Sequence, residues 1–276
     1  MSSYPPPGHL LSGLGLEVYS RSDGCVVTTA RVDPALLTLS PGSAPGMGVL
    51  APMVDMAAGS ASRRHLTNAW QVTSDMWLHE VAPLDPEGGG PIEVVAWDMR
   101  IGGRSMVFGC DVTQVGREVA TASLEFTRIR REASPYEKRP IGTSGKPVAV
   151  GSGPLMDRPL GEVMRFETGE GAVRLTRHDE VTNSIGTIQG GAIAMLADAA
   201  AVDHVGSGRV VDLHFRFLGQ TGAGPAIATC RTIRSDATSS TVSVEIVDSS
   251  AEDTVVGWAI VRLEDIASGN TMEEAQ

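Results

Sequence analysis

The sequence predicts an α+β protein built from two similar units, each an antiparallel sheet wrapped around one long helix. The first observation is an internal repeat: GMGVLAPMVDMAAG, starting at Gly46, aligns with QGGAIAMLADAAAV, starting at Gln189, and places Asp55 on Asp198. The second is that short β-rich runs flank both stretches in the same order. The connections between these runs are too short for the crossovers that parallel strands need, so the strands are expected to be antiparallel.

Each unit is predicted to contain two short strands, the helix and then four longer strands. In the first unit the strands are expected at residues 16–19, 25–31, 71–78, 91–100, 105–113 and 118–130. In the second they are expected at residues 161–164, 172–177, 209–215, 225–233, 241–247 and 254–263. One helix covers only part of such a sheet, so the two units are expected to pair through their sheets.

The boundaries between the units follow from composition. Residues 133–158 are rich in Pro, Gly, Ser and Lys, which is typical of an exposed linker. The first unit is therefore expected to span residues 1–132 and the second residues 159–276.

Composition and charge exclude several classes of function. The formal net charge of −11 argues against a nucleic-acid partner, because such binding depends on Lys and Arg against phosphate. No apolar run approaches the roughly 18 residues that cross a bilayer, so no membrane partner is expected. The first residues lack the basic and apolar regions of a signal peptide, which predicts a cytoplasmic protein. The three cysteines have no metal-ligand spacing and are expected to be small buried hydrophobes.

The two helices each carry a lone aspartate among apolar neighbours. Residues three and four positions from Asp198 are Ala194, Met195, Ala201 and Val202, which share its face of the helix. A carboxylate there is unfavourable unless it is paired or used. It could simply reach solvent at an edge or bond to a neighbouring turn. Its recurrence at an equivalent position of the repeat favours a functional interpretation.

A glycine doublet, Gly190-Gly191, stands where the loop from Asn183 to Gln189 enters the second helix. A helix N-terminus offers unpaired N–H groups and a partial positive charge, and glycine lets a ligand approach the backbone. An N–H group there could stabilise an oxyanion. Alternatively, the doublet only permits tight packing of the helix.

These residues resemble a known family. Asn183, Gln189, Gly190, Gly191 and Asp198 are similar to the Asn-x5-His-Gly-Gly-x7-Asp pattern of hotdog-fold acyl-CoA thioesterases, in particular the phenylacetate-pathway (PaaI-like) branch. The resemblance covers nearly all of both halves and implies a tandem, double-hotdog protein. Two departures stand out. Glutamine replaces the histidine of the pattern, and the first half has Ser40, Gly46 and Met47 at the asparagine, histidine and first glycine positions.

The resemblance implies composite sites between the two units. The catalytic candidates are Asp55, Thr73, Asn183, Gln189, Gly190 and Asp198, with Gly191 a contact of the bound coenzyme A thioester. One site would join Asp55 and Thr73 of the first unit to the Asn183–Gly190 loop of the second. The other would join Asp198 to the decayed positions Ser40, Gly46 and Met47, with Val210 in place of a Ser or Thr. We therefore expect the Asp55-centred site alone to be chemically competent.

In the implied reaction a thioester is hydrolysed and no cofactor is needed. The thioester carbonyl would face the Gly190 N–H, Asp55 would act as general base or as nucleophile, and Thr73 would orient the carboxylate or the water. Asn183 and Gln189 would position the thioester. By analogy with single-hotdog relatives, the chain is expected to form a homodimer.

Two other functions compete with this one. A hotdog hydratase would need an Asp-x4-His pair before the helix, and neither residues 40–46 nor residues 183–189 contain a histidine. A non-catalytic acyl-CoA-binding or regulatory protein would explain both the missing histidine and the decay of one loop. Turnover of acyl-CoA substrates would separate catalysis from binding.

Overall fold

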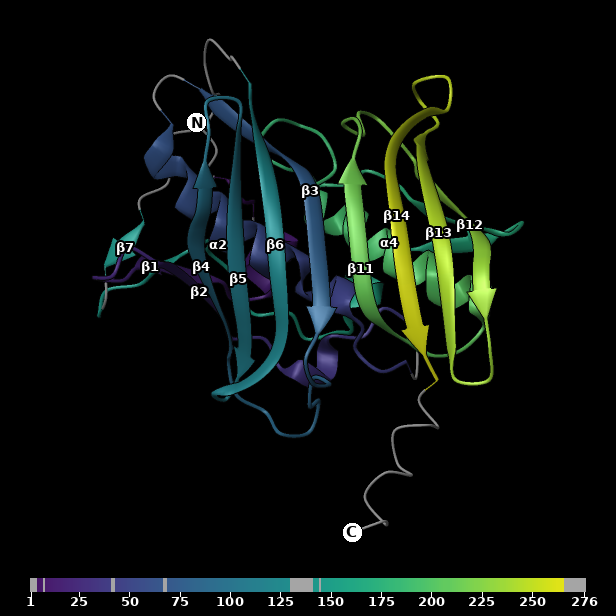
Figure 1. Ribbon diagram of the computed structural model, residues 1–276, viewed down its shortest axis with the longest axis horizontal. Coiled ribbons are helices and arrows are strands. Elements are labelled where there is room, and N and C mark those ends of the chain that lie inside the picture. Colours follow the sequence, from purple (N-terminus) through teal and green to yellow (C-terminus); the bar gives the residue numbers. More distant parts are fainter. Residues whose placement is uncertain are drawn as a thin grey trace.

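Two helices rich in small apolar residues lie side by side against one face of the sheet (Figure 1). In this computed structural model, which describes residues 4–6, 8–40, 43–66, 69–129, 141–143 and 145–265, they are α2 (Ala51–Ser62) and α4 (Gly190–Val205). A 3-10 turn, η2 (Met47–Leu50), leads into α2, and Pro52 occupies its first turn, where a missing N–H costs nothing. Gly206 ends α4 with a left-handed φ of 83°, a conformation that favours glycine.

The predicted order of elements is confirmed for the long strands of both units. The first unit contains β1 (Glu17–Ser20), β2 (Val26–Ala30), β3 (Trp70–Glu80), β4 (Ile92–Ile101), β5 (Ser105–Gln114) and β6 (Arg117–Ile129). The second contains β9 (Glu167–Gly169), β10 (Ala172–Leu175), β11 (Arg209–Phe217), β12 (Ala226–Ser235), β13 (Ser239–Asp248) and β14 (Thr254–Glu264). Each set forms an antiparallel sheet around its own helix.

The two sheets join into one. Within the described residues a 14-stranded sheet has the order β7-β1-β2-β4-β5-β6-β3-β11-β14-β13-β12-β10-β9, with β8 pairing with β1. The junction is β3 against β11, antiparallel, with Asp75–His79 opposite Asp212–Arg216 (Figure 1). The prediction that the units pair through their sheets is therefore confirmed, and the fold is an α+β double hotdog.

Alternation along the strands separates an inner from an outer face. In β3, Met76 and Leu78 are fully buried and point toward the helices, whereas Trp77 between them is 45% exposed. In β11 the buried pair is Leu213 and Phe215. The core therefore lies between the inner face and the two helices, and the outer face carries polar side chains together with Trp77 and Trp258.

One predicted strand is wrong. Residues 161–164 form a short helix, α3 (Leu160–Met164), and the first strand of the second unit, β9, comes three residues later. Gly161 packs directly on the backbone of Leu39, and its N–H donates to the Thr38 carbonyl at 2.9 Å. This contact with the first unit, which the local sequence does not reveal, favours a helix here.

Part of the predicted linker is built into the first sheet. Residues Gly142–Thr143 (β7) and Val148–Ala149 (β8) both pair with β1, and Val150 is fully buried. Residues 133–140 and 144 of the predicted linker lie outside the described residues. The chain thus returns to the edge of the first sheet before it begins the second unit.

The described N-terminal segment also crosses to the second unit. A one-turn helix, α1 (Leu10–Gly13), is buried, and the Leu10 N–H donates to the Glu180 carbonyl at 2.8 Å. None of the described helices has the length and apolar character needed to cross a membrane.

Candidate functional site

The starts of the two helices meet at the centre of the molecule. An added Cβ on Gly191, in the first turn of α4, would lie 2.7 Å from the Cα of Pro52 in the first turn of α2. An added Cβ on Gly48, in η2, would lie 2.6 Å from the Cβ of Asp198. Both approaches are too close for any residue with a Cβ. The repeat-related glycines therefore allow each helix start to contact the helix of the other unit.

Asp198 is enclosed by the backbone of the first unit. Its residue surface is 2% exposed, and its Oδ2 accepts a hydrogen bond from the Gly48 N–H at 2.8 Å. An added Cβ on Gly46 would lie 2.6 Å from the same oxygen. Burial raises the pKa of this carboxyl to about 7, against the opposing effect of the Gly48 hydrogen bond. The juxtaposition of Asp198 with the Gly46–Gly48 segment agrees with the predicted second constellation.

Asp55 has a different environment. It is half-buried, and its Oδ1 accepts a hydrogen bond from the Thr73 hydroxyl on β3 at 2.7 Å. Burial raises the pKa of Asp55 to about 6, and the Thr73 hydrogen bond opposes this rise. Asp55 follows Pro52 by three residues, so both lie on the face of α2 that approaches the start of α4. Val210 occupies the position in the second unit that corresponds to Thr73, and its side chain is apolar and fully buried.

The start of α4 holds a buried polar side chain, Gln189. Gln189 is the N-cap residue, but its side chain does not cap the helix. It is 5% exposed, and within the described chain its Oε1 has no hydrogen-bond partner. A buried acceptor without a partner costs about 1–3 kcal/mol, which a donor on a ligand or water would offset. The first N–H groups of any α-helix also lack intrahelical partners, so α4 presents donors beside this acceptor.

Phe217 of β11 borders the same helix start. An added Cβ on Gly190 would lie 3.3 Å from the Phe217 ring, and this ring packs on Phe215 with centroids 4.5 Å apart. Phe217 was not predicted as a site residue. Its only sequence signal is the alternation of Phe215 and Phe217 along β11, which indicates an inner-face pair rather than a site.

Asn183 organises its own loop. Its Nδ2 donates to the Thr187 hydroxyl at 2.7 Å, and its Oδ1 accepts from the N–H groups of Ile185 at 3.0 Å and Thr187 at 3.1 Å. The Arg177 guanidinium donates to the Gly186 carbonyl at 2.8 Å. Asn183 therefore shapes its own loop, and its expected role in positioning a thioester stays a prediction.

The loop that contains Thr221 and Gly222 packs against the Asn183–Gln189 loop. The Ile188 N–H donates to the Thr221 carbonyl at 3.1 Å, and the Gly222 N–H donates to Oδ2 of Asp248 at 2.7 Å. Asp248 is 2% exposed and also accepts from the N–H and hydroxyl of Ser250. Gln114 plays the matching part in the first unit, where its side chain bonds to the backbone of Asp85. No signal in the sequence singles out these two supports.

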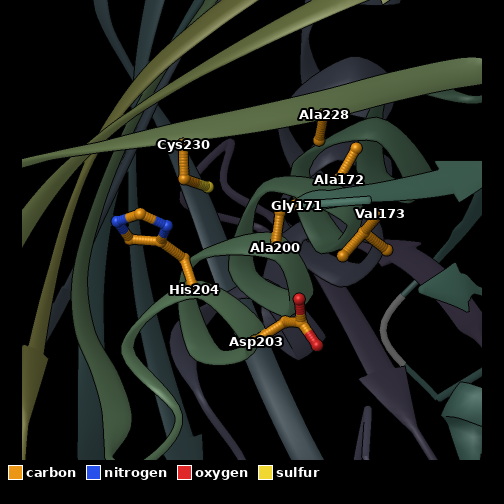
Figure 2. A pocket seen from close by; sticks show the side chains of 8 residues that line it. All are labelled: Gly171, Ala172, Val173, Ala200, Asp203, His204, Ala228 and Cys230. Atoms are coloured by element: carbon orange, nitrogen blue, oxygen red, sulfur yellow. The ribbon is translucent and has the colours of Figure 1, made fainter. Parts of the chain in front are cut away.

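A hollow of about 210 Å³ lies at the other end of α4, lined by Gly171, Ala172, Val173, Ala200, Asp203, His204, Ala228 and Cys230 (Figure 2). The group contains a thiol, an imidazole and a carboxylate. However, His204 bonds to the Thr232 hydroxyl at 2.9 Å, and burial raises the pKa of Cys230 to about 12. Such a thiol is a poor nucleophile at neutral pH. Among the described residues, no three His, Cys, Asp or Glu side chains gather as metal ligands would.

Comparison with solved structures supports the fold. The chain is similar to a hotdog-fold protein of unknown function from Alicyclobacillus acidocaldarius, with a TM-score of 0.57, 13% identity, and coverage of 93% of this chain and 98% of that one. It is similar to the 12:0-ACP thioesterase from Umbellularia californica, with a TM-score of 0.57, 9% identity, and coverage of 88% and 98%. It is also similar to an acyl-CoA thioesterase II from Mycobacterium marinum, with a TM-score of 0.51, 12% identity, and coverage of 88% and 94%.

Comparison of the sequence is informative for the second unit. Residues 178–263 match the family model described as the acyl-CoA thioesterase N-terminal domain. This segment includes the Asn183–Gly191 loop, α4, strands β11 to β13 and all but the last residue of β14. No curated protein matches the sequence. The branch predicted from the motif stays a prediction.

Proposed function

We propose that the protein is an acyl-CoA thioesterase whose active site combines Asp55 and Thr73 of the first unit with Gln189 and Gly190 of the second. The observation that carries this proposal is the arrangement around Asp55. A carboxylate with a raised pKa, oriented by the Thr73 hydroxyl at 2.7 Å, lies one helical turn from the contact between Pro52 and the start of α4. The match of residues 178–263 to an acyl-CoA thioesterase family gives independent support.

The proposed reaction uses the two helices for different purposes. The thioester carbonyl oxygen accepts a hydrogen bond from the Gly190 N–H, where the helix dipole stabilises developing negative charge. Ionised Asp55 takes a proton from a water molecule while the oxygen of that water attacks the carbonyl carbon. The tetrahedral intermediate then expels the coenzyme A thiolate, which is protonated to the thiol, and the free acid remains. Direct attack by Asp55, followed by hydrolysis of the acyl-enzyme, gives the same products.

The supporting residues have separate parts. Thr73 donates to one carboxylate oxygen of Asp55, which leaves the other free for water. The unpartnered Oε1 of Gln189 accepts a hydrogen bond from the attacking water. Asn183 keeps the loop in shape through its bonds to Ile185 and Thr187.

The two repeat-related sites are unequal in this proposal. The helix-start N–H of Gly48 already donates to Asp198, so that donor is not available to a thioester oxygen. Asp198 is also closed off by the Gly46–Gly48 backbone. We therefore assign turnover to the Asp55-centred site and a structural part to Asp198.

Thiol release from short, long and aromatic acyl-CoAs tests the proposal. Asp55→Ala is expected to lower kcat by on the order of 10²-fold or more, the usual scale for a positioned base. Asp198→Ala is the matched control, and Asp198→Asn covers the case in which the alanine variant does not fold. In a folded Asp198 variant kcat is expected to stay within about threefold of the unchanged protein.

Equal losses in the Asp55 and Asp198 variants would overturn the asymmetric site. Tight binding of acyl-CoA without release of thiol would instead favour a non-catalytic acyl-CoA-binding protein. The missing histidine at Gln189 and the closed Asp198 site are the observations on which that second function rests.

A further inference from the structure

His9 connects the N-terminal segment of the first unit to the loop that precedes α4 of the second. The residue is fully buried and is the N-cap of α1. Its Nδ1 accepts the Leu11 N–H at 3.1 Å, and its Nε2 lies 3.0 Å from the Thr182 carbonyl oxygen. The Tyr4 hydroxyl is 3.4 Å from the same Nε2, and the two rings meet edge to face.

The two main-chain partners determine the form of the imidazole. Because Nδ1 accepts from an N–H group, it carries no proton. Because Nε2 faces a carbonyl oxygen, it must carry the proton and donate it. The ring is therefore neutral, with its single proton on Nε2, and both nitrogens are engaged with main-chain groups.

The Thr182 carbonyl belongs to the stem of the functional loop. Thr182 and Ile188 form an isolated antiparallel bridge, and the Gln189 N–H donates to the Val181 carbonyl at 2.9 Å. A displacement of residues 181–182 would therefore move Gln189 and the first turn of α4. His9 thus lies one residue away, along the stem, from the hydrogen bond that holds Gln189.

Neighbouring contacts hold the other side of this stem. The Leu10 N–H donates to the Glu180 carbonyl at 2.8 Å. The Glu180 carboxylate is paired with Arg158 at 3.2 Å and Arg165 at 2.9 Å, and His178 lies 3.6 Å away. The stem is therefore held at residue 180 by an ion-pair cluster and at residue 182 by His9.

We propose that His9 is a positioning residue: its Nε2–H holds the Thr182 carbonyl and thereby keeps Gln189 and Gly190 of the second unit in place opposite Asp55 of the first. The inference rests on the proposed function for its effect on turnover. The hydrogen bond from His9 to the loop stem stands independently of that function. The N-terminal segment of one unit thus completes the site to which the loop of the other contributes.

Two substitutions separate the cap of α1 from the bond to Thr182. In His9→Asn, the amide oxygen can still accept the Leu11 N–H, since asparagine is a favoured N-cap, but no atom reaches Thr182. In His9→Gln, the amide nitrogen is as many bonds from Cβ as Nε2 is and can donate to Thr182. The first variant therefore keeps the cap of α1 and removes the bond to the loop together with the ring contact with Tyr4, whereas the second restores the bond without the ring.

The first readout is hydrogen–deuterium exchange of peptides that cover residues 181–191. We expect exchange to be about tenfold faster in His9→Asn, the effect of one lost hydrogen bond, and to return most of the way in His9→Gln. Peptides from β13, far from the stem, serve as the internal control. Unchanged exchange at residues 181–191 in folded His9→Asn would overturn the proposal, whether or not the protein is a thioesterase.

The second readout is steady-state turnover of the best acyl-CoA substrate. We expect His9→Asn to lower kcat about tenfold with KM within about twofold and Tm lower by only about 2–4 °C for each kcal/mol lost, and His9→Gln to recover activity. A fall in kcat that merely follows Tm in both variants would show a general structural role and contradict positioning. If the unchanged protein hydrolyses no acyl-CoA, the proposed function fails, and the exchange measurement still decides the role of His9.

Discussion

At the scale of single residues, the two repeat-related aspartates differ in their hydrogen-bond partners and in their exposure. Asp55 accepts a hydrogen bond from a hydroxyl on its own unit, whereas Asp198 accepts one from the backbone of the other unit. Burial raises both pKa values, to about 6 and about 7. The difference that matters for chemistry is therefore access, since Asp198 is 2% exposed and bordered by Gly46 and Gly48.

The raised pKa of Asp55 predicts a pH profile. A base must be ionised, so kcat/KM is expected to fall about tenfold per pH unit below about pH 6 and to level off above it. Thr73→Val removes the hydrogen bond that lowers this pKa, so the inflection is expected to move to higher pH. An unchanged inflection in a folded, active Thr73→Val variant would contradict the assignment to Asp55.

Asp198 predicts a pH dependence of stability. Its folded pKa of about 7 lies above its ordinary value of 3.8, so folding favours the protonated form. The stability that this group contributes is present below about pH 4 and is lost as the pH rises toward 7. Asp198→Asn should remove this loss. The difference in unfolding free energy between the variant and the unchanged protein is the quantity to compare. It is expected to be on the order of 2–4 kcal/mol more favourable to the variant at pH 8 than at pH 4.

Denaturant unfolding at both pH values measures this gain. Asp248→Asn is a suitable comparison, because burial raises the pKa of Asp248 but its hydrogen bonds together outweigh burial and hold the pKa below its usual value, which gives the opposite sign. An Asp198→Asn variant with the same pH dependence as the unchanged protein would show that Asp198 is not the titrating group.

At the scale of elements, two glycines, and not the strands, permit the close crossing of α2 and α4. Gly191 and Gly48 each remove a Cβ at a point where the other helix or its aspartate passes within 3 Å of where that atom would lie. The loop from Asn183 to Gln189 is then supported on one side by Thr221 and on the other by the stem that His9 contacts. The helix start is therefore a rigid element, which suits a preorganised hydrogen-bond donor.

Gly191→Ala tests this close crossing. The added Cβ would meet the Pro52 backbone, which cannot move aside as a flexible side chain can, so we expect a loss of about 1–3 kcal/mol in unfolding free energy. Gly103→Ala, in the turn between β4 and β5, is the control because nothing lies within 4 Å of its added Cβ. Equal stability of the two variants in urea would contradict the predicted contact.

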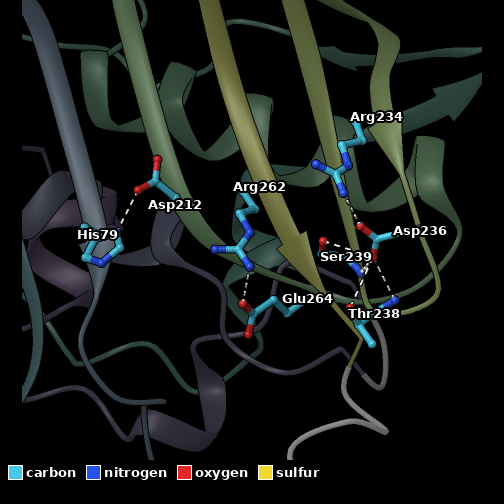
Figure 3. A network of polar contacts seen from close by, with 8 residues as sticks. All are labelled: His79, Asp212, Arg234, Asp236, Thr238, Ser239, Arg262 and Glu264. Atoms are coloured by element: carbon cyan, nitrogen blue, oxygen red, sulfur yellow. Dashed lines mark hydrogen bonds and ion pairs between the residues drawn. The ribbon is translucent and has the colours of Figure 1, made fainter.

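At the scale of the whole molecule, the junction of β3 and β11 makes two units into one body. On the outer face Asp75 pairs with His214 at 3.0 Å and with Arg216 at 2.9 Å. Asp212 pairs with His79 at 2.8 Å (Figure 3). At the end of the junction Arg209 pairs with Glu80, both largely buried. Each unit thus contributes one carboxylate to the junction, and the basic partner of that carboxylate comes from the other unit.

The outer face also predicts self-association. Trp77 and Trp258 are 45% and 38% exposed on this face, near the junction. Arg262 and Glu264 form an ion pair further along β14 (Figure 3). Exposed tryptophans are enriched at interfaces. We expect a homodimer by light scattering, and Trp77→Asp with Trp258→Asp is expected to give a monomer. Leu155→Asp, 40% exposed beside Gly15 and away from this face, should stay dimeric. A monomeric unchanged protein would contradict the prediction.

The pairing of Asp55 with Thr73 was expected from the family resemblance, and the structure has the Thr73 hydroxyl 2.7 Å from the Asp55 carboxylate. The sequence by itself determined the repeat and the strand order, because both depend on local periodicity and on short-range spacing. It failed at residues 161–164, where packing of Gly161 on Leu39 selects a helix. It also did not reveal that the Asn183 amide shapes its own loop through bonds to Thr187.

Only the tertiary structure decided which atoms enclose each aspartate and which distant residues support the site. Gly48 reaches Asp198, and His9 reaches Thr182, across 150 and 173 positions of sequence. Such contacts arise from the joining of β3 to β11 and the crossing of the helices, which bring remote backbone groups within hydrogen-bond distance. No local pattern encodes them, because their energy depends on burial and geometry that exist only once both units have packed together.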